Sequence, residues 1–248
     1  MGVAQAFKNF PGSAIHDMNA KILEVFRSVQ GEGPYAGITQ VFVRFFECNM
    51  HCVWCDTPAS IGDTSRNYKE TGLEDLFFQV NALYDGCHSV SITGGEPLLQ
   101  KDFLTELLPR LRQSGMRVYL ETNGTLPHEF AQVIGNVDIV AMDVKLPSST
   151  RQRGFWHEHE EFLRIAMRKR LFVKVVISKE TADEEMYQAV EMVKRVDPGI
   201  IFVFQPNYFD MKEGGGCVAK CVELQKYCSK ILEDVRITPQ VHKFMKLR

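Results

Sequence analysis

Short apolar runs alternate with longer amphipathic stretches from about residue 40 to the end of the chain. The apolar runs are rich in β-branched and aromatic residues, which is typical of buried strands. They predict strands over residues 41–45, 89–92, 118–121, 139–142, 172–177 and 201–204. The stretches between them carry apolar residues at helical spacing. They predict helices over residues 73–84, 102–113, 160–170, 183–195 and 218–233, with a last short strand near 235–237.

This alternation of strand and helix predicts a parallel sheet with right-handed crossovers. The strand–helix units are too few for a closed eight-stranded barrel, which needs about 250 residues. We therefore expect an α/β fold, a partial TIM-like barrel of parallel strands with outer helices, although the pattern does not exclude a flat doubly wound sheet. Residues 1–20 lack periodicity and are expected to form a flexible arm, which leaves 21–248 as one domain. In either architecture, ligands bind at the carboxyl ends of the strands.

Composition and charge exclude some classes of function. Lysine and arginine number 29 against 31 aspartate and glutamate, a formal net charge of −2. This balance argues against a nucleic-acid binder held by phosphate neutralisation. No apolar run approaches the roughly 18 residues of a membrane span, and no basic segment followed by an apolar core marks a secretory signal. We expect a cytoplasmic protein without a nucleic-acid or membrane partner.

Cysteines suggest the chemistry. In a reducing compartment, seven cysteines do not predict a disulfide framework. Cys48, Cys52 and Cys55 form a C-x3-C-x2-C triplet directly after the first predicted core strand, and three thiolates on one short loop can converge on a soft metal centre. Zinc would need a fourth ligand, which His51 could supply, whereas a four-iron cluster on three thiolates keeps one iron open. From the residues alone, three alternatives stay open: a zinc site, a four-iron cluster, and three buried cysteines that bind no metal.

A second motif follows the next predicted strand, where Val90–Thr93 lead into Gly94, Gly95, Glu96 and Pro97. Paired glycines let the backbone approach a ligand closely, and proline suits the first turn of a helix. Alone, this motif could be a plain turn. Other predicted strands also end in polar side chains, which together resemble the wall of a binding cleft. They are Glu121, Asn123, Asp143, Lys145, Gln205 and Asn207.

The cysteine triplet, Trp54 before its third cysteine and the glycine-rich turn one strand later resemble the radical S-adenosylmethionine (SAM) enzymes. Within that superfamily, further motifs over residues 22–243 together resemble the 7-carboxy-7-deazaguanine synthase family. They are Gln-Gly-Glu-Gly at 30–33, Arg44, Cys-Asp-Thr at 55–57, Thr-Gly-Gly-Glu-Pro at 93–97 and Gln-x-His-Lys at 240–243.

The resemblance implies a radical SAM core and a reaction. In this family, 6-carboxy-5,6,7,8-tetrahydropterin becomes 7-carboxy-7-deazaguanine with loss of ammonia, on the route to queuosine. The implied cofactors are one 4Fe-4S cluster, SAM and Mg²⁺. The cluster donates one electron to SAM, and the resulting 5′-deoxyadenosyl radical abstracts hydrogen at C6 of the pterin. A homodimer and an electron donor such as flavodoxin or ferredoxin are also implied.

The resemblance also implies roles for individual residues, although it assigns no general acid or base. Cys48, Cys52 and Cys55 would hold the cluster, and the hydroxyl of Thr57 would bind magnesium. Because an arginine fork matches a carboxylate, Arg44 is expected to bind the pterin carboxylate. The implied substrate residues are Val29, Gln30, Gly31, Glu32, Arg44 and Thr93. The implied SAM residues are Trp54, Asp56, Gly95, Glu96, Glu121, Asp143, Val144, Lys145, Gln205, Pro206, Asn207 and Tyr208.

Two rival functions stay open at this point. A glycyl-radical activating enzyme shares the triplet but does not predict the motifs at 30–33 and 55–57, and a zinc-stabilised binding module would have no turnover.

Three smaller features are also interpreted. Cys217, Cys221 and Cys228 have helical spacing, which favours packing over an auxiliary cluster. Residues 148–161, with His157 and His159 at a spacing that does not share a helix face, are expected to be a connection into a helix. The pair at 242–243 could reach the site or belong to a solvated tail.

Overall fold

The computed structural model describes residues 18–62 and 67–247 of the chain. In this part of the chain, nine strands form one sheet of order β3-β1-β2-β4-β5-β6-β7-β8-β9. The strands are β1 (Asn19–Val29), β2 (Thr39–Phe45), β3 (Lys69–Gly72), β4 (Ser89–Gly94), β5 (Val118–Thr122), β6 (Ile139–Asp143), β7 (Arg170–Ile177), β8 (Ile201–Pro206) and β9 (Val235–Ile237). From β2 to β9 all neighbours pair in parallel, whereas β1 and β3 pair antiparallel at one edge. Because β3 and β9 end the order, the barrel is open.

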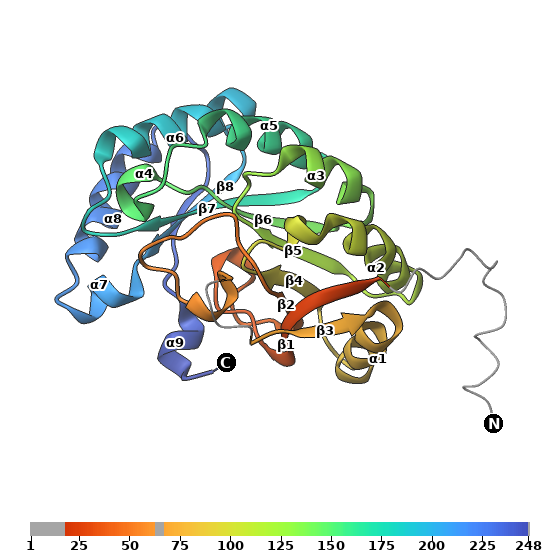
Figure 1. Cartoon of the computed structure of the whole chain (residues 1–248). Helices are drawn as coiled ribbons and strands as arrows, with labels where there is room; N and C mark the ends of the chain where they lie inside the picture. Colours follow the sequence, from red (N-terminus) through yellow and green to blue (C-terminus); the bar gives the residue numbers. More distant parts are fainter. Residues whose placement is uncertain (1–17, 63–66, 248) are drawn as a thin grey trace.

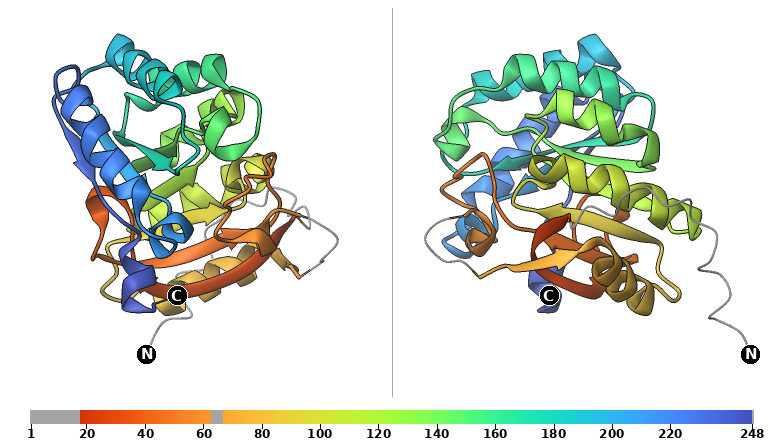
Figure 2. Two further views of the ribbon diagram at one scale, coloured as in Figure 1. Left: turned by 90° about the vertical axis from the view of Figure 1, so that its left-hand side faces the viewer. Right: turned by 45° about the vertical axis from the view of Figure 1, so that its right-hand side comes forward.

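The longer helices cover the outer side of this sheet, and shorter ones lie beside the ends of its strands. They are α1 (Leu73–Leu83), α2 (Lys101–Gln113), α3 (Pro127–Val133), α4 (Pro147–Thr150), α5 (Trp156–Ala166), α6 (Asp183–Val196), α7 (Tyr208–Lys212), α8 (Gly216–Cys228) and α9 (Val241–Met245). In Figures 1 and 2 the longer helices follow one another around the outside of the curved sheet, and each contacts the next from α1 to α8. The concave side of the sheet is therefore left for the site.

Successive side chains of a strand point to opposite faces of the sheet, and each face carries its own apolar cluster. Outward side chains such as Ile92, Leu120 and Val175 pack under the helices in the main core. A smaller cluster fills the inside of the curve with side chains from β5 to β8. Its buried members are Tyr119, Ile139, Ala141, Phe172 and Val203.

Polar side chains occupy the inward positions nearest the carboxyl ends of the strands, beyond the small inner cluster. The sheet register places Arg44 of β2 beside Thr93 of β4, and Asp143 of β6 beside Lys174 of β7. Glu121 of β5 and Gln205 of β8 continue this series. Because inward positions alternate with outward ones, each of these strands contributes polar chemistry to one edge while its other face stays apolar.

The predicted partial barrel is confirmed, and each predicted core strand is present to within two residues at either end. The predictions missed β1, whose polar and apolar residues mix instead of forming an apolar run, and they missed the short β3. They also missed α3, α7 and α9. The expected connection at 148–161 was wrong, because it contains α4 and the first turns of α5, which starts at Trp156. The last long helix ends at Cys228, five residues before its predicted end.

Most of the predicted arm, residues 1–20, lies outside the described residues, and its last two residues belong to β1. None of the helices in the described part of the chain is both long and apolar enough to cross a membrane.

Candidate active site

A cavity opens at the carboxyl edge of the sheet, inside its curve. The sequence-predicted residues that line it come from the loops after β1 and β2 and from the ends of most parallel strands. They are Val29, Gln30, Gly31, Glu32, Arg44, Cys48, Cys52, Trp54, Cys55, Asp56, Thr57, Thr93, Gly95, Glu121, Asp143, Lys145, Gln205, Asn207 and Tyr208. The fold thus brings nearly all the predicted residues together, whereas Glu96, Val144 and Pro206 are buried outside the cavity lining.

The loop that carries the cysteine triplet is fixed on both sides. The amide of Cys48 donates to the carbonyl of Ile61 at 3.1 Å, and the indole of Trp54 donates to the Ser149 hydroxyl at 2.8 Å. All three thiols are half-buried. Burial raises the pKa of each, that of Cys48 to about 12, so the metal-free thiols keep their protons near neutral pH. Metal binding therefore has to release these protons.

The three thiol sulfurs do not form a compact group in the described part of the chain. A tetrahedral zinc with Zn–S bonds of about 2.3 Å places its sulfur ligands about 3.8 Å apart. Within residues 18–62 and 67–247, the single trio of ligand atoms found within 4.8 Å of one another belongs to Glu32, Asp56 and His242, not to the cysteines. His51, the predicted fourth zinc ligand, is exposed.

The glycine-rich turn lets β4 approach the thiol loop. A Cβ atom on Gly95 would lie 2.1 Å from the carbonyl oxygen of Glu47, so only glycine fits there. The next residue, Glu96, is fully buried and accepts hydrogen bonds from the Thr122 hydroxyl and from the amides of Asn123 and Leu98. Burial raises the pKa of Glu96 to about 7. Glu96 therefore braces the loops after β4 and β5, and its contact with SAM implied by the resemblance stays a prediction.

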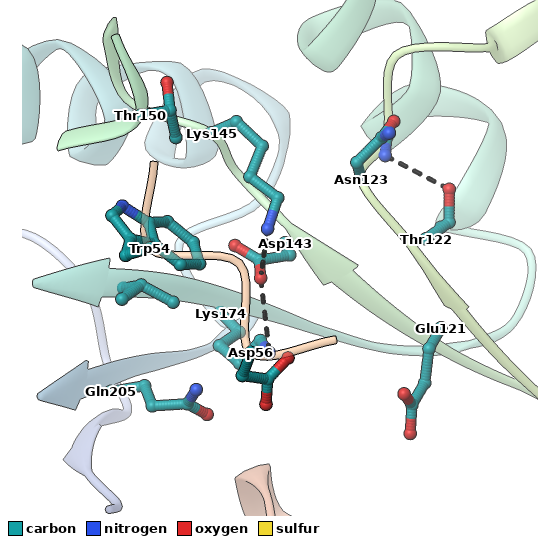
Figure 3. A network of polar contacts seen from close by, with 12 residues as sticks. Trp54, Asp56, Glu121, Thr122, Asn123, Asp143, Lys145, Thr150, Lys174 and Gln205 are labelled. Carbon is teal, nitrogen blue, oxygen red and sulfur yellow. Dashed lines mark hydrogen bonds and ion pairs between the residues drawn. The ribbon is translucent and has the colours of Figure 1, made fainter. Parts of the chain in front are cut away.

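A network of four charges crosses the cavity, with Asp143 buried and Glu32, Lys145 and Lys174 half-buried. The Asp143 carboxylate accepts from Lys145 at 2.8 Å and lies 3.2 Å from the ammonium of Lys174 (Figure 3). Lys174 also pairs with Glu32, and Lys145 lies 4.7 Å from the ring centre of Trp54. Burial alone would raise the pKa of Glu32, but Lys174 overcomes it and lowers that pKa to about 2. Two carboxylates and two ammonium groups thus balance each other.

Two buried acceptors face the cavity without a partner among the described residues. They are Oδ1 of Asp143 and Oε1 of Gln205. A buried acceptor is costly to leave unpaired, so this part of the cavity favours a ligand that carries N–H or O–H donors.

The opposite wall is built around Arg44 and Glu121. The Nε of Arg44 donates to Glu24 at 2.9 Å, and one terminal nitrogen lies 3.4 Å from the hydroxyl oxygen of Thr57. The carboxylate of Glu121 accepts hydrogen bonds from Gln30, Ser91 and Thr93.

The C-terminal segment closes one side of the cavity. Gln240 donates to Glu32 at 2.7 Å and to Asp56 at 2.9 Å. A Cβ atom on Gly31 would lie 2.0 Å from Nδ1 of His242, which shows that the imidazole packs directly on the glycine backbone. The solvated-tail alternative for His242 is therefore wrong.

Comparison with known proteins agrees with this arrangement. The profile of the radical SAM superfamily matches residues 43–197. A 7-carboxy-7-deazaguanine synthase of Geobacter sulfurreducens is 40% identical over 243 residues, which cover 91% of this chain and 97% of the relative. This chain belongs to the 7-carboxy-7-deazaguanine synthase family of radical SAM enzymes.

A second member of the family, from Archaeoglobus fulgidus, is 37% identical, with 93% of this chain and all of the relative covered. The crystal structure of QueE from Escherichia coli shares the fold, with a TM-score of 0.63 at 22% identity over 90% of this chain and 95% of that one. Membership of the family implies a 4Fe-4S cluster, SAM and Mg²⁺. The half-buried thiols and the unpaired acceptors fit the first two, and the hydroxyl of Thr57 beside Asp56 fits a hard cation.

Sequence reasoning missed Lys174 and did not assign Gln240. Lys174 could have been found, because it is the one charged residue inside the apolar run 171–177 and falls on the inward period of its strand. Gln240 lies in a terminal stretch whose place in the fold no local pattern indicates.

The cysteines of α8, Cys217, Cys221 and Cys228, are fully buried, as their helical spacing predicts. His159 is also buried, and its Nε2 lies 3.0 Å from the carbonyl oxygen of Asn123.

Proposed function

We propose that this chain is a 7-carboxy-7-deazaguanine synthase in queuosine, or 7-deazapurine, biosynthesis. It converts 6-carboxy-5,6,7,8-tetrahydropterin to 7-carboxy-7-deazaguanine and ammonia. The observation that carries the proposal is the meeting in one cavity of the thiol loop, the 30–33 motif, Arg44 and Thr57, in a chain similar to named synthases over nearly its whole length.

The cofactor half of the cavity is formed by the thiol loop and the ends of β6 and β8. We assign the cluster to Cys48, Cys52 and Cys55. When bound, the cluster supplies the electron that splits SAM into methionine and a 5′-deoxyadenosyl radical. We expect the unpaired oxygens of Asp143 and Gln205 to accept hydrogen bonds from the amino or hydroxyl groups of SAM, which their lack of a partner supports.

The substrate half lies across from it, on β1, β2, β4 and β5. Arg44 uses its Nε on Glu24 and one N–H of a terminal nitrogen on Thr57, and we expect the other N–H groups of its terminal nitrogens to bind the carboxylate of the pterin. Thr57 lies next to that guanidinium, and its hydroxyl would hold the magnesium ion on the substrate side of the cavity.

Glu121 belongs to this half rather than to the SAM half to which the resemblance assigned it. All three of its donors, Gln30, Ser91 and Thr93, come from the substrate wall. A carboxylate on this wall suits the N–H groups at the edge of a pterin ring.

Cellular context forms part of the proposal. All seven cysteines are free thiols, which supports the cytoplasm, where thiols stay reduced. We also expect the protein to form a homodimer and to receive electrons from a flavodoxin or ferredoxin. We expect no nucleic-acid or membrane partner.

The test is turnover of the reconstituted protein under anaerobic conditions. With the pterin, SAM, Mg²⁺ and a reductant, we expect 7-carboxy-7-deazaguanine and ammonia in equal amounts, and a lower rate when Mg²⁺ is omitted. Cleavage of SAM without product would instead favour an activating enzyme that needs a protein partner. A protein that binds zinc and does not cleave SAM would support the binding module.

A further inference from the structure

A line of hydrogen-bonded side chains runs from the interior of the sheet to the substrate wall. Gln40 of β2 donates from its Nε2 to the hydroxyl of Ser89 at 2.8 Å. Its Oε1 accepts from Nε2 of Gln30 at 2.9 Å. The same Gln30 nitrogen donates its other hydrogen to Glu121 at 2.8 Å. Gln40 has no exposed surface and does not line the cavity, whereas Gln30 and Glu121 do.

The two amides can satisfy this line in only one orientation. Gln30 must present its nitrogen to Glu121, because a carboxylate can only accept, and its oxygen accepts from the amide of Glu32 at 3.0 Å. Gln40 must then present its oxygen to the Gln30 nitrogen, which leaves its own nitrogen for Ser89. Reversing either amide would set like groups against each other in a buried place, which is costly.

This line acts on the part of the site that faces the substrate. The first oxygen of Glu121 accepts from Gln30 and, at 3.2 Å, from Ser91, and the second accepts from Thr93 at 2.8 Å. Through the amide of Glu32, the Gln30 side chain also fixes the start of the 30–33 motif. Gln30 itself is 2% exposed, and both hydrogens of its side-chain nitrogen are donated to protein groups. Its side chain therefore holds Glu121 and the loop in place.

We propose that Gln40 is a positioning residue for the pterin: through Gln30 it sets the direction of the Glu121 carboxylate that receives the N–H groups of the ring. The inference rests on the proposed function and adds a residue that does not touch the ligand. Gln40 lies on the far side of Gln30 from the cavity, so its loss should affect the substrate half and spare the thiol loop.

The test replaces Gln40 by leucine, which has similar size but offers no hydrogen bonds. In the reconstituted Gln40→Leu enzyme we expect the KM for the pterin to rise roughly tenfold or more, because the carboxylate loses its orienting partner. The KM for SAM, the iron content and SAM cleavage without pterin should stay within about twofold of the wild type.

Two further variants separate positioning from general stability. In Gln40→Glu, a carboxylate can still accept from Gln30 and from the Ser89 hydroxyl, so we expect the KM for the pterin to return toward that of the wild type. Thr71→Val is the matched control, because it removes a buried hydroxyl of β3 outside the cavity lining. It should leave both KM values unchanged.

The outcomes distinguish this inference from the proposed function. A wild-type enzyme that makes no product removes the proposed function. A wild type that turns over, with an unchanged pterin KM in Gln40→Leu, overturns the role of Gln40 alone. If Gln40→Leu does not fold, Ser89→Ala decides, because it removes the acceptor that anchors the Gln40 amide nitrogen. A raised pterin KM in Ser89→Ala supports the inference, and an unchanged one contradicts it.

Discussion

The protein has two cysteine triplets, and they differ in everything except residue type. Cys48, Cys52 and Cys55 lie on a loop at the carboxyl edge of the sheet, are half-buried and line the cavity. The triplet of α8 lies in the outer layer, and each of its thiols is fully buried (Figure 1). The same side chain is thus placed for metal chemistry in one region and for packing in the other.

Acidity does not distinguish the two triplets. Burial raises the pKa of Cys48 to about 12, and burial likewise raises that of Cys221 to about 12. The difference lies in position. The loop follows a strand of the parallel sheet, where ligands bind, whereas the helical spacing of the α8 thiols turns them toward the core. Position relative to the sheet edge therefore predicts the role better than the reactivity of the thiol does.

The largest predicted effect is loss of the first triplet. Cys52→Ala removes one of three thiolates, so we expect no cluster and no 5′-deoxyadenosine above background, measured by chromatography after anaerobic reconstitution. The matched control is Cys221→Ala, which should cleave SAM like the wild type. Residual cleavage in Cys52→Ala, or loss of cleavage in Cys221→Ala, would break the comparison.

A change in the cavity wall should separate the thiol loop from the substrate half. In Arg44→Ala we expect unchanged iron content and unchanged SAM cleavage without pterin, but a KM for the pterin raised tenfold or more. Arg44→Lys keeps the positive charge but loses the planar guanidinium group, so its KM for the pterin should lie between those of the wild type and Arg44→Ala. Loss of iron in Arg44→Ala would refute the assignment of this residue.

A smaller effect is expected where the outer layer meets the cavity. Burial lowers the pKa of His159 on α5 to about 4 from an ordinary 6.5. Between pH 6.5 and pH 4 the unfolded chain binds the His159 proton before the folded chain does. The contribution of His159 to the free energy of unfolding is therefore fully present above pH 6.5 and is lost progressively as pH falls toward 4. On going from pH 7.5 to pH 5, the free energy of unfolding should therefore fall by about 2 kcal/mol less in His159→Gln than in the wild type.

Urea unfolding at the two pH values measures this difference. Other titrating groups act in both proteins and cancel in the comparison. Equal losses in the two proteins would show that His159 is not the group that titrates.

The smallest effect belongs to the second triplet. Cys221→Ala deletes a buried sulfur from the main core, and we expect the free energy of unfolding to fall by about 1 kcal/mol. Iron content and turnover should not change. A fall in iron would mean that the α8 thiols serve a cluster after all.

Much of the fold and site could be predicted from the sequence because the signals are local. Apolar runs marked the parallel strands, and the residues that follow them, such as Cys48 and Asp143, fell at one edge. β1 escaped because it is half polar. Lys174 is recognisable as the one charge in an apolar strand, but its partners Glu32 and Asp143 lie in other segments of the chain. Gln240 depends on contacts with Glu32 and Asp56 more than 180 residues away in the chain, which no local pattern reports.

The most direct test of the account is the metal content of three reconstituted proteins. We predict about four iron and four sulfide ions per chain in the wild type and in Cys221→Ala, and none in Cys52→Ala. Zinc in place of iron in the wild type, or equal iron in all three proteins, would contradict the claim that the thiol loop holds the cluster.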